Sequence, residues 1–140
     1  MKELTEGRHM LSGVGDTTIE NYWGHEDTEV TLFCIDGETW GMYIDPDDGY
    51  RSYSSVLLYP EERCQTMFEP QPVDISFNHT EFSEYDGGTM YIRDIMTIKD
   101  AINGKVIVEI GTDSYDSYYP TGFFHYYPEN MEVNKNSNHS

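Results

Sequence analysis

Short runs of alternating apolar and polar residues, separated by turn residues, cover most of the chain. The clearest block is residues 29–59, which predicts three strands joined by two tight acidic turns. Residues 30–35 are apolar apart from Thr31, as expected for a strand covered on both faces. Asp36-Gly37 then predicts a two-residue hairpin, because a type I′ turn needs positive φ at both central positions. We expect the rest of the chain to be organised around this block.

The second turn of the block concentrates negative charge. Trp40, Met42 and Ile44 alternate with smaller or more polar residues on the return strand. Residues 45–49, DPDDG, follow, with a proline that fixes φ and a glycine that allows a left-handed exit. Alternation resumes over residues 51–59, so the sequence predicts a strand on each side of a rigid acidic turn.

Further strands are predicted beyond a proline-interrupted connection at residues 60–72. A fourth strand covers residues 73–77. Residues 90–98 and 105–110 form another pair around the turn signal Asn103-Gly104, although a helical turn over 98–102 would shorten the first of them. A last strand is expected at residues 122–127.

The pattern predicts one all-β or strand-dominated α+β domain. Its expected architecture is an antiparallel meander of about six or seven short strands that forms a small barrel or sandwich. The predicted organisation is an N-terminal arm at residues 1–28, the β domain at 29–130 and a disordered tail at 131–140. Within the arm, either a short helical turn from Asp16 to Asn21 or an irregular segment laid over the core fits the residues.

Charge narrows the choice of partner. The chain has 26 Asp and Glu residues against eight Lys and Arg, a formal net charge of −18. The basic residues are scattered, so no basic stripe exists to follow a phosphate backbone, and direct nucleic-acid binding is not expected. An anionic membrane surface would repel the chain. The partners that suit this field are cations and basic protein surfaces, although high charge also serves solubility alone.

Cysteine content and hydropathy indicate a cytoplasmic protein, either of the producing cell or of a cell that it infects. Cys34 and Cys64 are the only cysteines, too few for a disulfide scaffold, and Cys34 is expected to be a small buried side chain. The first ten residues lack the apolar segment of a signal peptide, and no apolar run approaches the ~18 residues of a membrane span.

Motifs for metal binding or catalysis are weak. Asp45, Asp47 and Asp48 suggest a calcium site, but the EF-hand pattern fails because glycine comes one place early and Val56 stands where the closing Glu belongs. The five histidines share no metal-ligand spacing, and HExxH and CxxC are absent. No G-x-S-x-G elbow surrounds the serines. No cofactor is predicted, Ca²⁺ stays an alternative, and a small hydrolase using paired carboxylates is a third reading.

Residues 112–128 are rich in aromatic side chains. A last strand whose tyrosines cover the sheet edge explains them, because aromatics are enriched in strands and edges need cover. An exposed aromatic platform for a partner explains them too, since Tyr is enriched at interfaces. The seven rings are Tyr115, Tyr118, Tyr119, Phe123, Phe124, Tyr126 and Tyr127.

Four segments, FCIDGETW, DPDDGYRSY, GKVIVEIGTDSYDSYYP and YYPENM, resemble a pattern in small uncharacterised proteins encoded by tailed bacteriophages. The resemblance covers about residues 31–131 with gaps. It implies no activity and no site residue. It does imply a context in which small acidic proteins inhibit host enzymes or defence systems, often by nucleic-acid mimicry.

The sequence therefore predicts a non-enzymatic acidic protein that binds a basic protein surface, such as a host nucleic-acid-handling enzyme or defence protein, with mimicry of DNA as one route. The alternative is a calcium-binding or structural domain such as a minor virion component. The predicted partner-binding residues are Asp45, Asp47, Asp48, Asp113 and Asp116, with Tyr50, Tyr115, Tyr118 and Tyr119 beside them.

Overall fold

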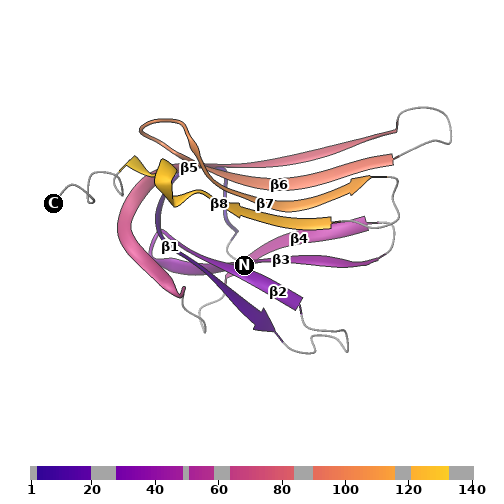
Figure 1. Cartoon of the computed structure of the whole chain (residues 1–140), viewed down its shortest axis with the longest axis horizontal. Coiled ribbons are helices and arrows are strands. Elements are labelled where there is room, and N and C mark those ends of the chain that lie inside the picture. The colour runs from indigo at the N-terminus through magenta and orange to yellow at the C-terminus, as the bar shows by residue number, and fades with distance from the viewer. Residues whose placement is uncertain are drawn as a thin grey trace.

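The computed structural model describes residues 3–19, 28–48, 51–58, 64–83, 90–115 and 121–132 (Figure 1). Strands dominate these residues, with one short 3₁₀ helix after the last strand. The elements are β1 (Gly7–Ile19), β2 (Thr28–Ile35), β3 (Glu38–Asp48), β4 (Arg51–Leu58), β5 (Thr66–Ser83), β6 (Met90–Asp100), β7 (Val106–Tyr115), β8 (Thr121–Tyr126) and η2 (Pro128–Asn130).

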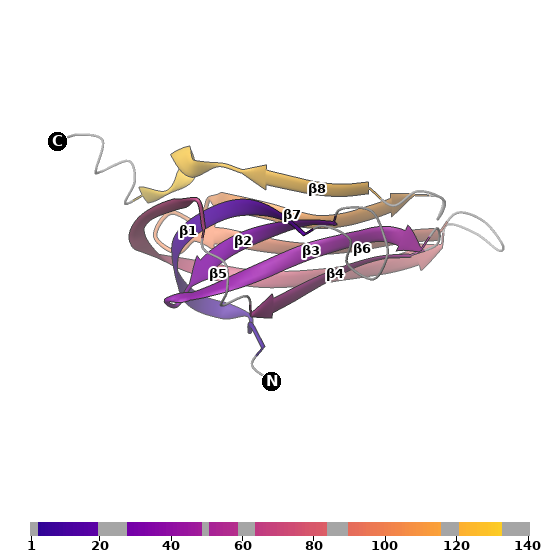
Figure 2. The same ribbon diagram turned by 90° about the horizontal axis from the view of Figure 1, so that it is seen from below.

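All eight strands form one antiparallel sheet with the order β4-β3-β2-β1-β5-β6-β7-β8. Two four-stranded meanders are joined side by side where β1 pairs with β5. The sheet curls into a half-barrel, so β4 comes close to β7 and β3 to β8 across the interior (Figures 1 and 2). The predicted strand-dominated antiparallel class is confirmed, with eight strands in the described residues where six or seven were expected.

Irregularities in the two central strands accompany the curl. The register of β1 shifts between Leu11 and Gly13 against both of its neighbours. On β5, the pairing with β1 jumps from Met67 to Gln71, so Pro70 lies where no ladder hydrogen bond is needed. Extra residues of this kind bend a strand and increase its twist. Both strands curve strongly at the left of Figure 1.

The core fills the concave side of the sheet. Phe33 and Ile35 of β2, Met96 of β6 and Ile110 of β7 are fully buried, and the ring of Phe33 meets that of Phe124 on β8 edge-on at 6.4 Å. The alternation of these positions with more polar ones follows from the two-residue period of a strand. The main cluster is Leu11, Val14, Phe33, Ile35, Trp40, Met42, Val73, Ile75, Met96, Ile98, Ile107, Val108, Ile110 and Met131.

The first hairpin forms as its turn residues predict. Asp36 has φ 54° and Gly37 has φ 78°, the positive values that a type I′ turn requires. The second predicted hairpin is wider than Asn103-Gly104 suggests. The amide of Asp100 donates to the carbonyl of Lys105, and only Gly104 has positive φ in this connection. The predicted helical turn over 98–102 is not formed, because β6 continues to Asp100.

Three boundaries differ from prediction. Residues 7–19, expected as an arm or helical turn, form β1 in the middle of the sheet. Residues 66–72, expected within a connection, begin β5. Met131, expected in a disordered tail, is 1% exposed in the main core.

The acidic turn predicted at residues 45–49 is shorter than expected. β3 continues to Asp48, which pairs with Arg51, and the register is irregular between Asp45 and Asp48. β7 likewise continues to Tyr115, five residues beyond its predicted end. The strands are therefore longer, and they carry several acidic positions that were expected in turns.

Candidate functional site

Antiparallel pairing brings four strand-to-strand connections to the same end of the half-barrel. β1, β3, β5 and β7 end there, and β2, β4, β6 and β8 begin there, toward the right of Figure 1. We call this end, with the chain segments 16–31, 43–55, 79–94 and 112–122, the hairpin end. The residues that connect the strands lie outside the described part of the chain, and only their amino-acid composition is considered.

The hairpin end is strongly acidic in sequence. The strand residues within its segments comprise eight acidic positions against two basic ones, Arg51 and Arg93, and the connecting residues contain no Lys or Arg. Fourteen of the 26 acidic residues of the chain fall in the four segments, which are two-fifths of its length. They are Asp16, Glu20, Glu26, Asp27, Glu29, Asp45, Asp47, Asp48, Glu81, Glu84, Asp86, Asp94, Asp113 and Asp116.

Tyrosine is concentrated in the same segments. Nine of the 12 tyrosines belong to them, and the remaining three are Tyr59, Tyr126 and Tyr127. In the register, Tyr91 stands opposite Tyr115 on β6 and β7. Four of these tyrosines have a described backbone, and they lie on strands that begin or end at the hairpin end: Tyr43, Tyr53, Tyr91 and Tyr115.

The predicted partner-binding residues divide into two groups. Asp45, Asp47 and Asp48 lie on the last part of β3, and Asp113 and Tyr115 lie on the last part of β7. Both strands end at the hairpin end, and β4, the partner of β3, comes close to β7. The side chains of these five residues lie outside the described structure, as do Tyr50, Asp116, Tyr118 and Tyr119 as whole residues.

One described ion pair borders the hairpin end. His79 of β5 and Asp94 of β6 face each other in register, with 2.5 Å between the imidazole Nδ1 and the carboxylate Oδ1. The pair continues the inward-facing row of β5 beyond Ile75 and Phe77, where exposure rises from 2% to 37%. Sequence reasoning missed the pair, because it depends on the β5–β6 register.

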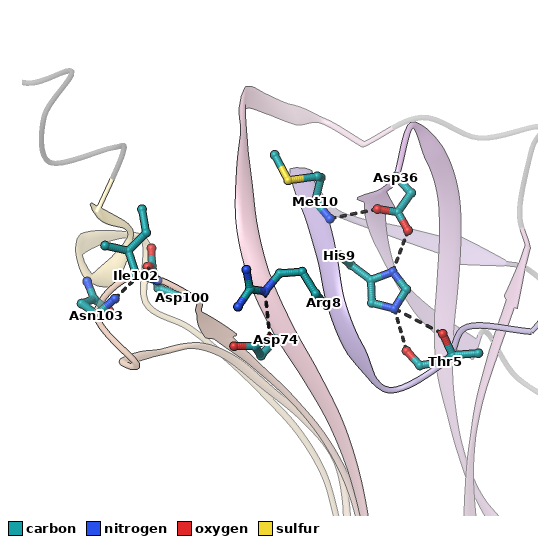
Figure 3. Close-up of polar contacts among 9 residues, drawn as sticks. All are labelled: Thr5, Arg8, His9, Met10, Asp36, Asp74, Asp100, Ile102 and Asn103. Atoms are coloured by element: carbon teal, nitrogen blue, oxygen red, sulfur yellow. Dashed lines mark hydrogen bonds and ion pairs between the residues drawn. The ribbon is translucent and has the colours of Figure 1, made fainter.

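At the opposite end, a buried carboxylate organises the β6–β7 connection (Figure 3). Asp100 is 1% exposed, and its Oδ1 accepts the amides of Ile102 and Asn103 at 2.7 and 3.1 Å. Its Oδ2 accepts the amide of Glu132 at 2.8 Å. Three backbone donors supply the partners that a buried carboxylate needs, so this group has a structural role.

A second polar cluster fixes the first hairpin to β1 (Figure 3). The Asp36 carboxylate accepts the Met10 amide at 2.9 Å and lies 2.6 Å from Nδ1 of His9. The other ring nitrogen of His9 is 2.7 Å from the carbonyl of Thr5. Arg8 pairs with Asp74 at 3.0 Å on the exposed side of β1 and β5. These contacts join neighbouring strands and stabilise their pairing.

The described residues contain no cluster of metal-binding side chains. No group of three or more His, Cys, Asp or Glu side chains among them is arranged to hold a metal ion. Among the described residues, the pKa values of Cys64 and Tyr126 are displaced. Burial and then the neighbouring Cys34 raise the pKa of Cys64 to about 11, and burial followed by Glu129 raises the pKa of Tyr126. Both shifts favour the neutral side chain at neutral pH.

Comparison with protein-family models, with curated proteins and with solved structures finds no match for this chain. Among the described residues, no helix has the length and apolar character needed to cross a membrane. Fold and charge therefore define an antiparallel half-barrel with an acidic hairpin end, and function has to be argued from that geometry.

Proposed function

We propose that this chain is a non-enzymatic binding protein whose hairpin end engages a basic protein surface. The observation that supports this most directly is the strand order, which brings the acidic ends of β3, β5 and β7 to one side of the molecule. With a different strand order, these acidic residues, which are far apart in the sequence, would lie on different sides of the molecule.

Electrostatics would act mainly on association. With a net charge of −18, the protein attracts cationic surfaces at distances of about a Debye length, roughly 8 Å at physiological salt. Such steering can raise association rates by ~10–10³-fold, and the effect falls steeply with ionic strength. Charge at the hairpin end would also select the face that meets the partner.

Tyrosines would supply much of the lifetime of the complex. Tyrosine is enriched among residues that dominate interface energetics, because it combines apolar area with a polar tip. Rim charges change the association rate more than the dissociation rate. We therefore assign capture to Asp45, Asp47, Asp48, Asp113 and Asp116, and retention to Tyr50, Tyr115, Tyr118 and Tyr119.

A nucleic-acid-handling protein is the partner class that we favour. Acidic residues on alternate positions of a strand are about 6.8 Å apart, and neighbouring strands lie about 4.8 Å apart. Strand ends with this spacing can present a dense array of carboxylates, and duplex DNA presents one charge per ~1.7 Å of its axis. A basic groove that binds phosphates would accept such an array. Inhibition of a host enzyme or defence protein by a phage product is the biological form of this proposal.

The test compares two charge-reversal variants that differ only in where the charge changes. In the first, Asp45, Asp47 and Asp48 become Lys. In the control, three exposed acidic residues outside the hairpin end, Glu3, Glu69 and Glu129, become Lys. Each protein is immobilised and used to capture host proteins at low salt, and affinity for the captured protein is then measured across a salt series.

We expect the hairpin-end variant to lose the partner and the control to keep most of its affinity. Wild-type affinity should fall as salt rises, because ion pairs across the interface are screened. Equal affinities for all three proteins together with a flat salt response would contradict the proposal. Circular dichroism and thermal melting verify that both variants fold.

A further inference from the structure

The two cysteines share a small apolar cluster on the convex side of the sheet. Cys34 of β2 alternates with the inward-facing Phe33 and Ile35, so it faces away from the main core. It packs with Val30, Leu32 and Cys64 in a cluster separate from that core. Both cysteines are 7% exposed and neither is in a disulfide. Residues distant in sequence thus bring two thiols to one site.

Two glycines of β1 explain how the thiols approach each other. A Cβ on Gly15 would lie 2.6 Å from the amide nitrogen of Gln65 and 3.3 Å from Cα of Cys64, so the chain entering β5 crosses directly over β1. A Cβ on Gly13 would lie 3.2 Å from Cβ of Cys34. Gly13 and Gly15 are about 6.8 Å apart along the strand. The two cysteines therefore border neighbouring positions on one face of β1.

The surroundings of the two sulfur atoms differ. The Ser12 hydroxyl donates a hydrogen bond of 3.1 Å to Sγ of Cys34, at the atom where negative charge develops when the thiol reacts. Cys64 has no such donor among the described contacts. Burial, followed by the electrostatic effect of Cys34, raises its pKa to about 11. The two cysteines belong to the same cluster of buried residues, which places both thiols in one region of the convex side.

We propose that Cys34 and Cys64 form a redox modification site that a small peroxide oxidises to an intramolecular disulfide. The Cys34 thiolate attacks hydrogen peroxide, the O–O bond breaks, and Cys34 becomes a sulfenic acid while hydroxide leaves. The Cys64 thiolate then attacks Sγ of Cys34, the S–O bond breaks, and the leaving oxygen takes a proton to become water. Overall, two thiols and one peroxide give one disulfide and two waters.

A disulfide here would tie β2 to the start of β5. The bond joins residues separated by 30 positions in the sequence, so it removes conformational freedom from the unfolded chain. It would also fix the crossover between the two four-stranded halves of the sheet. A disulfide needs Cα atoms within about 7 Å of each other, so its formation tests directly how closely Cys34 and Cys64 approach across β1. The inference is independent of the proposed binding function.

The experiment treats the reduced protein with hydrogen peroxide and measures its intact mass. We expect a loss of 2 Da, a cross-linked peptide that contains Cys34 and Cys64, and full reversal by dithiothreitol. Thermal melting should rise by roughly 5–10 °C in the oxidised protein, from the entropy of closing the loop. The rate of disulfide formation should rise between pH 7 and 9, because both steps need a thiolate and burial keeps the thiolate fraction of Cys64 low at neutral pH.

Two variants assign the order of the steps. In Cys64→Ser, the sulfenic acid at Cys34 cannot be resolved and should be trapped by dimedone. In Cys34→Ser, dimedone labelling of Cys64 should be at least tenfold slower. Gains of 16, 32 or 48 Da in the wild-type protein without the 2 Da loss would overturn the proposal. The proposal would also be overturned if the thiols of the wild-type protein reacted with peroxide only in denaturant. This measurement does not depend on whether a variant folds.

Discussion

At the scale of single residues, Gly111 in the middle of β7 is the described glycine whose Cβ position lies closest to the backbone of a neighbouring strand. Gly111 stands between Ile95 on β6 and Phe123 on β8. A Cβ at this position would collide with the carbonyl oxygen of Asp94 and lie 2.9 Å from Cα of Ile95. Only a hydrogen fits against backbone atoms at such distances, so glycine is required here for packing and not for its φ angle.

We predict that Gly111→Ala lowers the free energy of unfolding by about 3 kcal/mol. The added methyl meets backbone, which moves only if the β6–β7 pairing is disturbed, and overpacking of this kind costs several kcal/mol at most. Chemical denaturation measures the change. Glu109→Ala, two residues earlier on the same strand, is the control and should cost less than about 1 kcal/mol. A Gly111→Ala protein as stable as the wild type would show that the strands separate easily at this point.

Glycines also explain one limit of sequence reasoning. Local pattern alone predicts a flexible break at Gly13-Val14-Gly15, because glycine weakens an isolated strand. In the structure these residues belong to β1, and the glycines make room for Met67, Cys34 and the chain at Gln65. The reason for the glycines is a contact between distant parts of the chain, which local patterns do not contain.

At the scale of elements, turn chemistry was predictable and pairing across connections was not. Asp36-Gly37 forms the expected hairpin because both of its residues tolerate positive φ. The two prolines at residues 70 and 72 suggested a connection, yet the strand accommodates them beside an irregularity of the ladder. The candidate site follows the same rule. The concentration of acidic residues was visible in the composition, but their place on β3 and β7 was not, and the His79–Asp94 pair depends on a register set by β5 and β6.

The start of the C-terminal segment, at Met131, differs from what its sequence predicts. Its polar composition predicted disorder from residue 131, but Met131, which directly follows η2, is buried in the main core, and residues 133–140 lie outside the described part of the chain. Nε2 of Gln71 donates to Sδ of Met131 at 2.8 Å, and Asn103 donates to the carbonyl of Asn130 at 3.0 Å. Met131 thus fixes the residues around it to the main core.

We predict that Met131→Ala lowers the free energy of unfolding by about 3 kcal/mol, the usual cost of removing a large buried side chain. Denaturant titration measures the loss. Glu129→Ala changes an exposed residue two positions earlier and should stay within about 0.5 kcal/mol of wild type. Equal stability of the two variants would mean that the segment contributes little to the core.

At the scale of the whole molecule, the balance of acidic and basic residues changes along the strand direction of the half-barrel. The described basic residues Arg8, Lys99 and Lys105 belong to strands or connections away from the hairpin end, whereas Arg51 and Arg93 stand in it. Arg51 pairs in register with Asp48, and Arg93 with Asp113. The half-barrel therefore has one end in which acidic residues outnumber basic ones severalfold, and this asymmetry makes a directed interaction with a basic surface reasonable.

The same asymmetry predicts how stability depends on salt. Repulsion among like charges destabilises a folded protein of net charge −18, and salt screens it as the Debye length falls from about 30 Å at 0.01 M to 10 Å at 0.1 M. We expect the melting temperature to rise by several degrees between these two NaCl concentrations.

Because repulsion grows with local charge density, neutralising Asp45, Asp47 and Asp48 to Asn should raise the melting temperature at low salt and flatten the salt response. Neutralising Glu3, Glu69 and Glu129 to Gln removes the same charge elsewhere and should flatten it less. Identical salt responses in the two variants would mean that the acidic charge acts as an even field over the molecule, and a concentrated binding end would then lack its physical basis.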